Sequence, residues 1–185
     1  MSLHFAFMDI YRDSFPSPIG TIYIAFSSEG IIRIALTEER FGKYSLCKRR
    51  KNDEARTQFK EYFDGKRKEF SLPLHFEGTP FQKKVWNVLR EIPYGETRSY
   101  EWVAKEVGKP RASRAVGNAV GANHLPIVIP CHRVIRKDGG LGGYGYGAAI
   151  KKKLLEIELG TPFLEPLSLE KKVASHPKKY LKGRG

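Results

Sequence analysis

The chain has 185 residues, 41% of them hydrophobic, which is enough for one large domain or two small ones around an ordinary core. Its 33 Lys and Arg against 20 Asp and Glu give a formal charge of +13, which points to a polyanionic partner, above all nucleic acid. A lysine-rich surface that serves only solubility is the alternative. No apolar run reaches the roughly 18 residues of a membrane span, and residues 1–14 lack the pattern of a secretory signal. We therefore expect a cytoplasmic protein with no membrane partner.

Residues 1–77 are expected to form a small α+β domain without evident chemistry. Two runs of β-branched residues each follow a turn that ends in glycine, which indicates a hairpin. The expected elements are strands over residues 21–26, 31–36 and 69–76 and a helix from Asn52 to Gly65.

Residues 78–165 are expected to be mainly helical. Thr79-Pro80-Phe81-Gln82 is a capping box with proline at the first helical position. Ser99 can cap a second helix, and Gly-Lys-Pro separates that helix from a third, an arrangement typical of a helix-turn-helix. The predicted helices cover residues 80–92, 100–107, 111–123 and 148–159.

The third of these helices has an unusual composition. Seven of the twelve residues from Arg111 to Ala122 are Ala, Gly or Ser, and Arg111 and Arg114 carry its charges. Each internal glycine costs roughly 1 kcal/mol relative to alanine, so close approach to another surface is the expected compensation. That surface is either the protein interior or a DNA minor groove, whose width a thin helix suits better than the base edges of the major groove.

The two cysteines, Cys47 and Cys131, show no metal-ligand spacing, and the histidines are scattered. A structural zinc site is therefore not expected, and free thiols are favoured although the sequence leaves a disulfide between them open. Cys131-His132-Arg133 follows the apolar run 127–129 and Pro130, which predicts a buried strand that ends at the thiol. An inert core cysteine is the alternative, because burial raises the pKa of a thiol.

Glu158 shares the inward stripe of the last predicted helix with Ile150 and Leu154. A carboxylate near a helix C-terminus opposes the helix dipole, so a buried partner such as a histidine would explain it; a frayed, solvated last turn is the alternative. Together Cys131, His132 and Glu158 fit the logic of a cysteine–histidine–carboxylate triad. A cysteine hydrolase is compatible with that triad, but a thiol that reacts with DNA also explains the helix pair and the charge.

Residues 139–147 contain six glycines. No Gly-Lys-Ser/Thr follows, which excludes a P-loop. We expect a loop whose backbone can approach a flat ligand closely.

The motifs PCHRV, RAVGNAV, TPFQKKVW, IPYGETRSY and LLEIE resemble those of methylated-DNA–protein-cysteine methyltransferases, the O6-alkylguanine-DNA alkyltransferases, over about residues 79–160. The resemblance implies an α+β fold: an RNase H-like N-terminal domain (1–77) and a mainly helical catalytic domain with the helix-turn-helix (78–165). Residues 166–185 hold six Lys and Arg against one Glu, which predicts a basic tail, either a docked short helix or a mobile arm, with simple disorder as the alternative. The same resemblance implies direct-reversal repair of double-stranded DNA by a monomer without cofactor or metal. The alkyl group of O6-alkylguanine, or of O4-alkylthymine, would pass once to Cys131 after minor-groove binding and base flipping. A non-catalytic sensor of alkyl damage is the alternative.

The resemblance also implies roles for single residues. Cys131 would be the alkyl acceptor, His132 its water-mediated base, and Glu158 the carboxylate behind that base. Tyr100 would turn the nucleotide and protonate guanine N3, and Asn123 would be the hinge between the helix and the active site. The DNA-binding residues would be Arg114, which fills the place of the flipped base, with Ser99, Ala115, Gly117 and Ala119. The substrate pocket would comprise Val134, Tyr144, Gly145 and Lys151.

Two departures from the family pattern matter. Non-catalytic relatives carry tryptophan at the cysteine position, so the presence of Cys131 argues for activity. Gly145 stands where some members have serine, which leaves the range of alkyl groups open.

Overall fold

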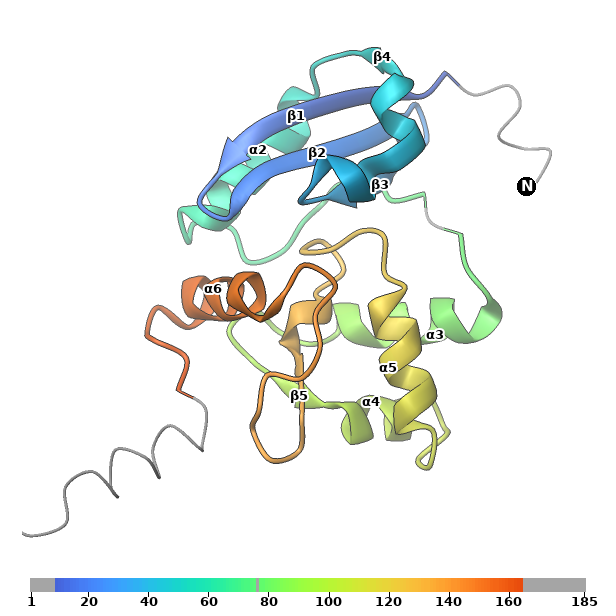
Figure 1. Ribbon diagram of the computed structural model, residues 1–185, viewed down its shortest axis with the longest axis vertical. Coiled ribbons are helices and arrows are strands. Elements are labelled where there is room, and N and C mark those ends of the chain that lie inside the picture. Colours follow the sequence, from blue (N-terminus) through green and yellow to red (C-terminus); the bar gives the residue numbers. More distant parts are fainter. Residues whose placement is uncertain (1–8, 76, 165–185) are drawn as a thin grey trace, which may run out of the picture.

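The computed structural model describes residues 9–75 and 77–164, so the expected basic tail (166–185) lies outside the described residues. A small sheet with one long helix stacks on a second layer built mainly of helices (Figure 1). No helix within these described ranges is long and apolar enough to cross a membrane.

The N-terminal sheet is an antiparallel meander with one short added strand. Its strands are β1 (Tyr11–Ser17), β2 (Gly20–Ser27), β3 (Gly30–Ala35) and β4 (Lys48–Arg49), in the order β3-β2-β1-β4 with β4 parallel to β1. Two of the three strands predicted here, 21–26 and 31–36, are confirmed as β2 and β3. The strand predicted at 69–76 is wrong for the residues described there: only Leu74 bridges to Ile31, because Pro73 has no N–H with which to extend a ladder.

Short helices connect and cover this sheet. They are α1 (Glu38–Phe41), the 3-10 helix η2 (Gly42–Leu46) and α2 (Asp53–Phe63). The Asn52 side chain accepts a hydrogen bond from the backbone of Ala55, which confirms the predicted cap of α2. Helix α2 buries Phe59 and Tyr62, and Phe59 packs against Phe15 of the sheet.

The C-terminal layer contains α3 (Pro80–Arg90), β5 (Arg98–Ser99), α4 (Tyr100–Glu106), α5 (Ser113–Gly121), the 3-10 helix η3 (Cys131–Arg133), β6 (Val134–Ile135) and α6 (Ala148–Leu159). The capping box at Thr79 and Gln82 and the Ser99 cap on Trp102 are both present, as predicted. Helices α4 and α5 pack together as the predicted pair, but α5 begins after Arg111, which lies outside it.

The strand predicted before the thiol is wrong. Residues 127–129 form a tight turn in which Ile127 has a φ of 76°, a conformation that β-branched residues rarely adopt. Cys131 then begins η3 instead of ending a strand at Pro130. The apolar residues are explained by burial alone, since Ile127 is 1% and Ile129 0% exposed.

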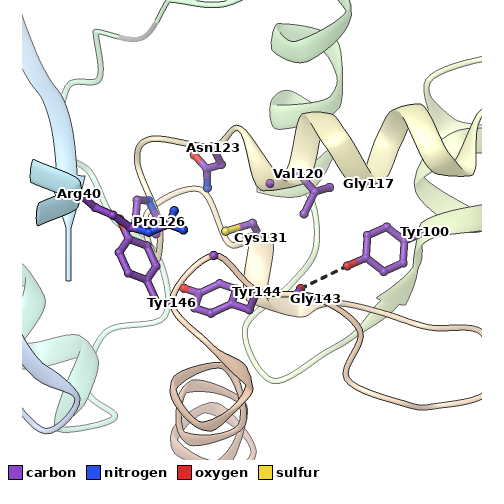
Figure 2. Close-up of a pocket in the computed structure, with 12 residues that line it drawn as sticks. Arg40, Tyr100, Gly117, Val120, Asn123, Pro126, Cys131, Gly143, Tyr144 and Tyr146 are labelled. Carbon is purple, nitrogen blue, oxygen red and sulfur yellow. Dashed lines mark hydrogen bonds between the residues drawn. The ribbon is translucent and has the colours of Figure 1, made fainter. Parts of the chain in front are cut away.

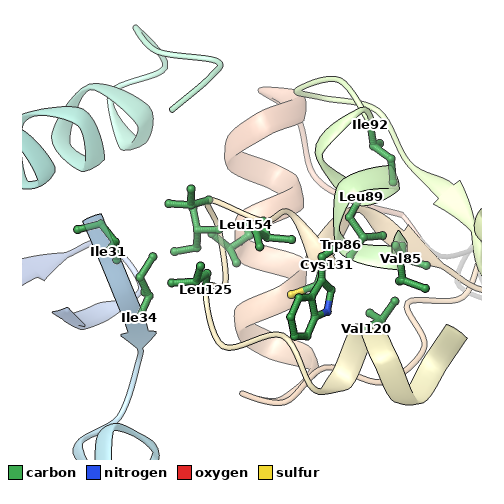
Figure 3. Packing of buried hydrophobic residues seen from close by; sticks show 14 of the residues in the cluster. Ile31, Ile34, Val85, Trp86, Leu89, Ile92, Val120, Leu125, Cys131 and Leu154 are labelled. Carbon is green, nitrogen blue, oxygen red and sulfur yellow. The ribbon is translucent and has the colours of Figure 1, made fainter. Parts of the chain in front are cut away.

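One hydrophobic core runs through both layers. Ile31 and Ile34 of β3 face Leu125 and Leu154 of the C-terminal layer (Figure 3). The backbone N–H of Ile34 also donates to the carbonyl of His124, at 2.9 Å. The N-terminal layer therefore packs directly on the segments that position Cys131.

Candidate active site

A cavity of about 350 Å³ opens beside α5, and Cys131 lies on its wall (Figure 2). Helices α4 and α5, the turn after α5, the glycine-rich loop 139–147 and α1 all contribute to it. The lining residues are Arg40, Tyr100, Gly117, Val120, Gly121, Asn123, Pro126, Cys131, Gly143, Tyr144, Gly145 and Tyr146. Both Cys131 and Cys47 are free thiols, which removes the disulfide that the sequence left open.

Behind the thiol, Glu158 points inward from α6, and its side chain is completely buried. Its Oε1 lies 2.7 Å from His132 Nε2 and accepts from Arg133 Nη2 at 3.0 Å, while Oε2 accepts from Arg133 Nε at 2.9 Å. Tyr62 Oη also donates to Oε1, at 2.7 Å, and the backbone N–H of Gly95 donates to Oε2, at 3.1 Å. His132 is therefore the buried partner that the inward position of Glu158 led us to expect.

The electrostatics of these groups follow from burial and pairing. Burial would raise the pKa of Glu158, but the hydrogen bonds and charges of His132 and Arg133 outweigh it and lower that pKa to about 2. Burial lowers the pKa of His132 in spite of Glu158, so the imidazole is neutral near pH 7. Burial also raises the pKa of the Cys131 thiol, against the lowering influence of Asn123 and Lys151. A protonated thiol thus lies next to a neutral histidine.

The ionised carboxylate fixes the tautomer of His132. Because Glu158 Oε1 accepts, Nε2 must carry the hydrogen, and Nδ1 is left as an acceptor. Nδ1 is buried and has no hydrogen-bond partner among the residues that the structure describes. The ring is therefore prepared to take up a proton at Nδ1.

Asn123 holds the turn that leads to the thiol. Its Nδ2 donates to the carbonyl of Ile129 at 2.9 Å, and its Oδ1 accepts from the backbone of Leu125 at 3.0 Å. The same side chain opposes the rise that burial causes in the pKa of Cys131. Asn123 therefore connects the end of α5 to the turn that precedes Cys131.

The glycine-rich loop forms the wall opposite α5. Tyr100 Oη lies 3.5 Å from the carbonyl oxygen of Gly143, and a Cβ on Gly142, whose φ is 67°, would come within 3.3 Å of the same hydroxyl. The Tyr144 hydroxyl lies in this wall, buried and without a partner in the described structure. Lys151 does not line the cavity. Its ammonium instead holds the loop by donating to the carbonyls of Val134, Leu141 and Gly143.

The residues expected to contact DNA are distributed over several environments. Arg114 and Ala115 are exposed near the start of α5, and Gly117 lines the cavity. Ala119 does not fit the expected exposed face: it is 3% exposed, and Trp86 Nε1 donates to its carbonyl at 2.8 Å, so its small side chain serves internal packing. Ser99 is half-buried and caps α4. Val134 is fully buried and, like Lys151, is not part of the cavity wall.

Sequence reasoning missed the N-terminal contribution to this site. Arg40 of α1 lies 5.0 Å from the centroid of the Tyr146 ring, and its Nη1 would be 3.0 Å from a Cβ on Gly145. No local motif marks Arg40, because its role depends on how the layers pack. The cavity residues missed were Arg40, Val120, Gly121, Pro126, Gly143 and Tyr146.

The fold and the cavity define the class: two-domain proteins that place a cysteine beside a helix-turn-helix. Residues 80–160 match the family model described as 6-O-methylguanine DNA methyltransferase, DNA binding domain, and residues 10–76 match its ribonuclease-like domain. The chain belongs to the methylated-DNA–protein-cysteine methyltransferase family. The predicted family and α+β fold class are thus confirmed.

Relatives and solved structures agree with this assignment. The constitutive methylated-DNA–protein-cysteine methyltransferase of Bacillus subtilis is 46% identical over 156 residues, covering 80% of this chain and 94% of the relative. That of Methanosarcina acetivorans is 44% identical over 153 residues, covering 80% and 98%. The crystal structure of Mycobacterium tuberculosis OGT in complex with DNA matches with a TM-score of 0.77 and 39% identity, covering 82% of this chain and 95% of that chain.

Proposed function

We propose that this protein repairs O6-alkylguanine, and O4-alkylthymine, in double-stranded DNA by a single transfer of the alkyl group to Cys131. One observation carries the proposal: the cavity that holds Cys131 shares its wall with α5 of the helix-turn-helix, and the His132–Glu158 pair lies directly behind it. A base that leaves the duplex at α5 would enter this cavity. The protein would act as a cytoplasmic monomer without cofactor.

The reaction is an in-line displacement at the alkyl carbon. His132 Nδ1 accepts the Cys131 proton, directly or through one water molecule, and the imidazolium is stabilised by Glu158. The thiolate attacks the alkyl carbon, a carbon–sulfur bond forms, and the bond from that carbon to guanine O6 breaks with its electron pair going to the base. Tyr100, on the cavity wall, protonates N3 of the leaving guanine. The thioether product is stable, so each molecule reacts once.

Base flipping would precede this step. Unstacking a nucleotide costs a few kcal/mol, and a side chain that fills its place offsets part of that cost. Arg114, exposed near the start of α5, is proposed for this role, with Ala115 and Gly117 allowing α5 to approach the minor groove. Asn123 would couple α5 to the thiol.

The test uses duplex DNA with O6-methylguanine labelled in the methyl group. We expect one equivalent of label on the protein. Cys47→Ala should retain the label and Cys131→Ala should not, although each substitution removes one free thiol. Repeating the assay with O4-methylthymine tests the second substrate. Label on Cys131→Ala would remove that residue from the role proposed.

Two rival functions give different results in the same assay. A damage sensor would bind the modified duplex tightly without becoming labelled. A cysteine hydrolase would release a product repeatedly and leave no label at the end. The free thiol in the cavity favours transfer over the sensor.

A further inference from the structure

Tyr62 places an N-terminal residue in the hydrogen-bond network behind the thiol. It lies on α2, is fully buried, and donates from its hydroxyl to Glu158 Oε1 at 2.7 Å. That oxygen also lies 2.7 Å from His132 Nε2. Two residues from different layers therefore share one carboxylate oxygen.

The choice of acceptor is informative. A buried tyrosine hydroxyl needs a partner, and a backbone carbonyl would satisfy it. The neighbouring Tyr94 shows this arrangement: its ring meets that of Tyr62 edge to face at 5.8 Å, but its hydroxyl donates to the carbonyl of Ile157, at 3.2 Å. Tyr62 reaches the carboxylate instead. Each hydrogen-bond donor to a carboxylate oxygen stabilises its negative charge, which makes that oxygen less basic.

The groups around the His132–Glu158 pair come from several elements. Tyr62 approaches from α2, Tyr94 from the segment after α3, Arg133 from η3, Tyr144 from the glycine-rich loop and Lys151 from α6. Arg133 bonds both carboxylate oxygens. Tyr62 remains a neutral donor, because burial and the neighbouring Glu158 hold its pKa well above 10.

We propose that Tyr62 is a positioning residue for alkyl transfer: by donating to Glu158 Oε1, its hydroxyl limits how strongly the carboxylate stabilises the imidazolium of His132. The inference rests on the proposed function, in which His132 accepts the proton of Cys131. The ribonuclease-like domain thereby helps to set the pH range in which the thiol reacts.

Tyr62→Phe keeps the ring and removes the hydroxyl. Oε1 then has one donor fewer, the imidazolium is better stabilised, and the pKa of His132 rises. Since His132 must be neutral to accept a proton, the acid limb of the rate–pH profile should move to higher pH by roughly 0.5 to 1 unit. Tyr94→Phe is the matched control, because it removes a neighbouring hydroxyl that does not touch the carboxylate; its profile should remain that of the parent.

Two reactions are followed between about pH 5 and 9 in a Cys47→Ser background. One is single-turnover transfer from labelled O6-methylguanine duplex, and the other is alkylation of Cys131 by iodoacetamide, with thermal melting to report folding. Failure of transfer in the parent would overturn the proposed function, while the iodoacetamide profiles still test Tyr62. An unshifted iodoacetamide profile for Tyr62→Phe, or an equal shift for Tyr94→Phe, would overturn the inference.

A second variant tests the same inference if Tyr62→Phe fails to fold. Incorporation of 3-fluorotyrosine at position 62 keeps the ring and the hydrogen bond but makes the hydroxyl a stronger donor. The acid limb should then move to lower pH, opposite to the effect of removing the hydroxyl. No movement, or movement to higher pH, contradicts the positioning role.

Discussion

The Glu158 side chain is the acceptor on which most of the buried polar groups behind Cys131 converge. Its buried carboxylate accepts hydrogen bonds from Tyr62, Arg133 and Gly95 and faces His132 Nε2. A buried charge is tolerated only when it is paired and hydrogen-bonded in this way. Arg133 is itself only 6% exposed, and Glu158 supplies the negative charge that pairs with its guanidinium.

Glu158→Gln should therefore affect both stability and reaction. The neutral amide leaves the Arg133 guanidinium buried without its counter-charge, and we expect a loss of about 3–5 kcal/mol in the free energy of unfolding. Alkyl transfer should slow by at least about tenfold, because the imidazolium loses its partner. Urea unfolding and single-turnover assays measure the two effects. Glu156→Gln on the same helix, whose carboxylate lies 4.0 Å from Lys152, should change stability by less than about 1 kcal/mol; equal effects would contradict the assigned role.

The depressed pKa of Glu158 also predicts how stability depends on pH. With a pKa of about 2 in the folded protein against 4.5 for the free side chain, its contribution is fully present above pH 4.5 and is lost as the pH falls toward 2. At about 1.36 kcal/mol per pKa unit, the contribution is about 3 kcal/mol. Urea unfolding at a series of pH values should show the parent losing more stability than Glu158→Gln over this interval. Parallel curves would mean that the carboxylate is not preferentially stabilised.

At the level of elements, the sequence correctly predicted the features that depend only on neighbouring residues, namely where helices begin and which side chains face inward. The caps at Asn52, Thr79 and Ser99 begin helices as expected, because each depends on residues within three positions. The inward position of Glu158 follows in the same way from helical spacing.

Other features depend on packing that no local pattern contains. The run 127–129 is apolar enough for a strand, but the turn there holds Ile127 at a φ of 76° so that it fills the core. The contact of Arg40 with Tyr146 joins elements of different domains. The expected exposure of Ala119 was wrong for a related reason, since small residues on α5 serve both its inner and its outer face.

The glycine-rich loop is held by α6, and this can be tested at Lys151. Its buried ammonium donates to the carbonyls of Val134, Leu141 and Gly143, and burial lowers its pKa to about 8. Lys151→Met keeps the chain length but leaves these carbonyls without the donor. We expect a loss of about 1–3 kcal/mol and faster hydrogen exchange in residues 139–147.

The control for this substitution lies next to it. Lys152→Met removes the same charge from the adjacent, half-exposed position on α6. It should leave loop exchange and stability unchanged. If both variants loosen the loop equally, the effect comes from charge and not from the buried hydrogen bonds.

Across the whole molecule, the two domains share a hydrophobic core and both line the cavity that holds Cys131. Ile31 and Ile34 of the sheet pack against Leu154 of the helix that carries Glu158. Tyr62 reaches Glu158 in the network behind the thiol, and Arg40 lines the cavity that holds Cys131. The helix-turn-helix lies away from the sheet, at the opposite end of the molecule from β4 (Figure 1). Charge at these two ends should consequently have different effects on DNA binding.

The +13 charge gives a final prediction about where DNA binds. A cationic side chain that enters the duplex, or lies against its phosphates, neutralises duplex charge and releases a counterion, so its removal should reduce the slope of log K against log salt by about 0.9. Arg114→Met on α5 should show this reduction together with weaker duplex binding, while the reaction of Cys131 with iodoacetamide stays at the parent rate. Arg49→Met on β4 removes one exposed charge from the far end and should leave the slope unchanged. Fluorescence anisotropy over a range of salt concentrations distinguishes the two variants, and equal slopes for both would mean that net charge, not the helix-turn-helix surface, governs binding.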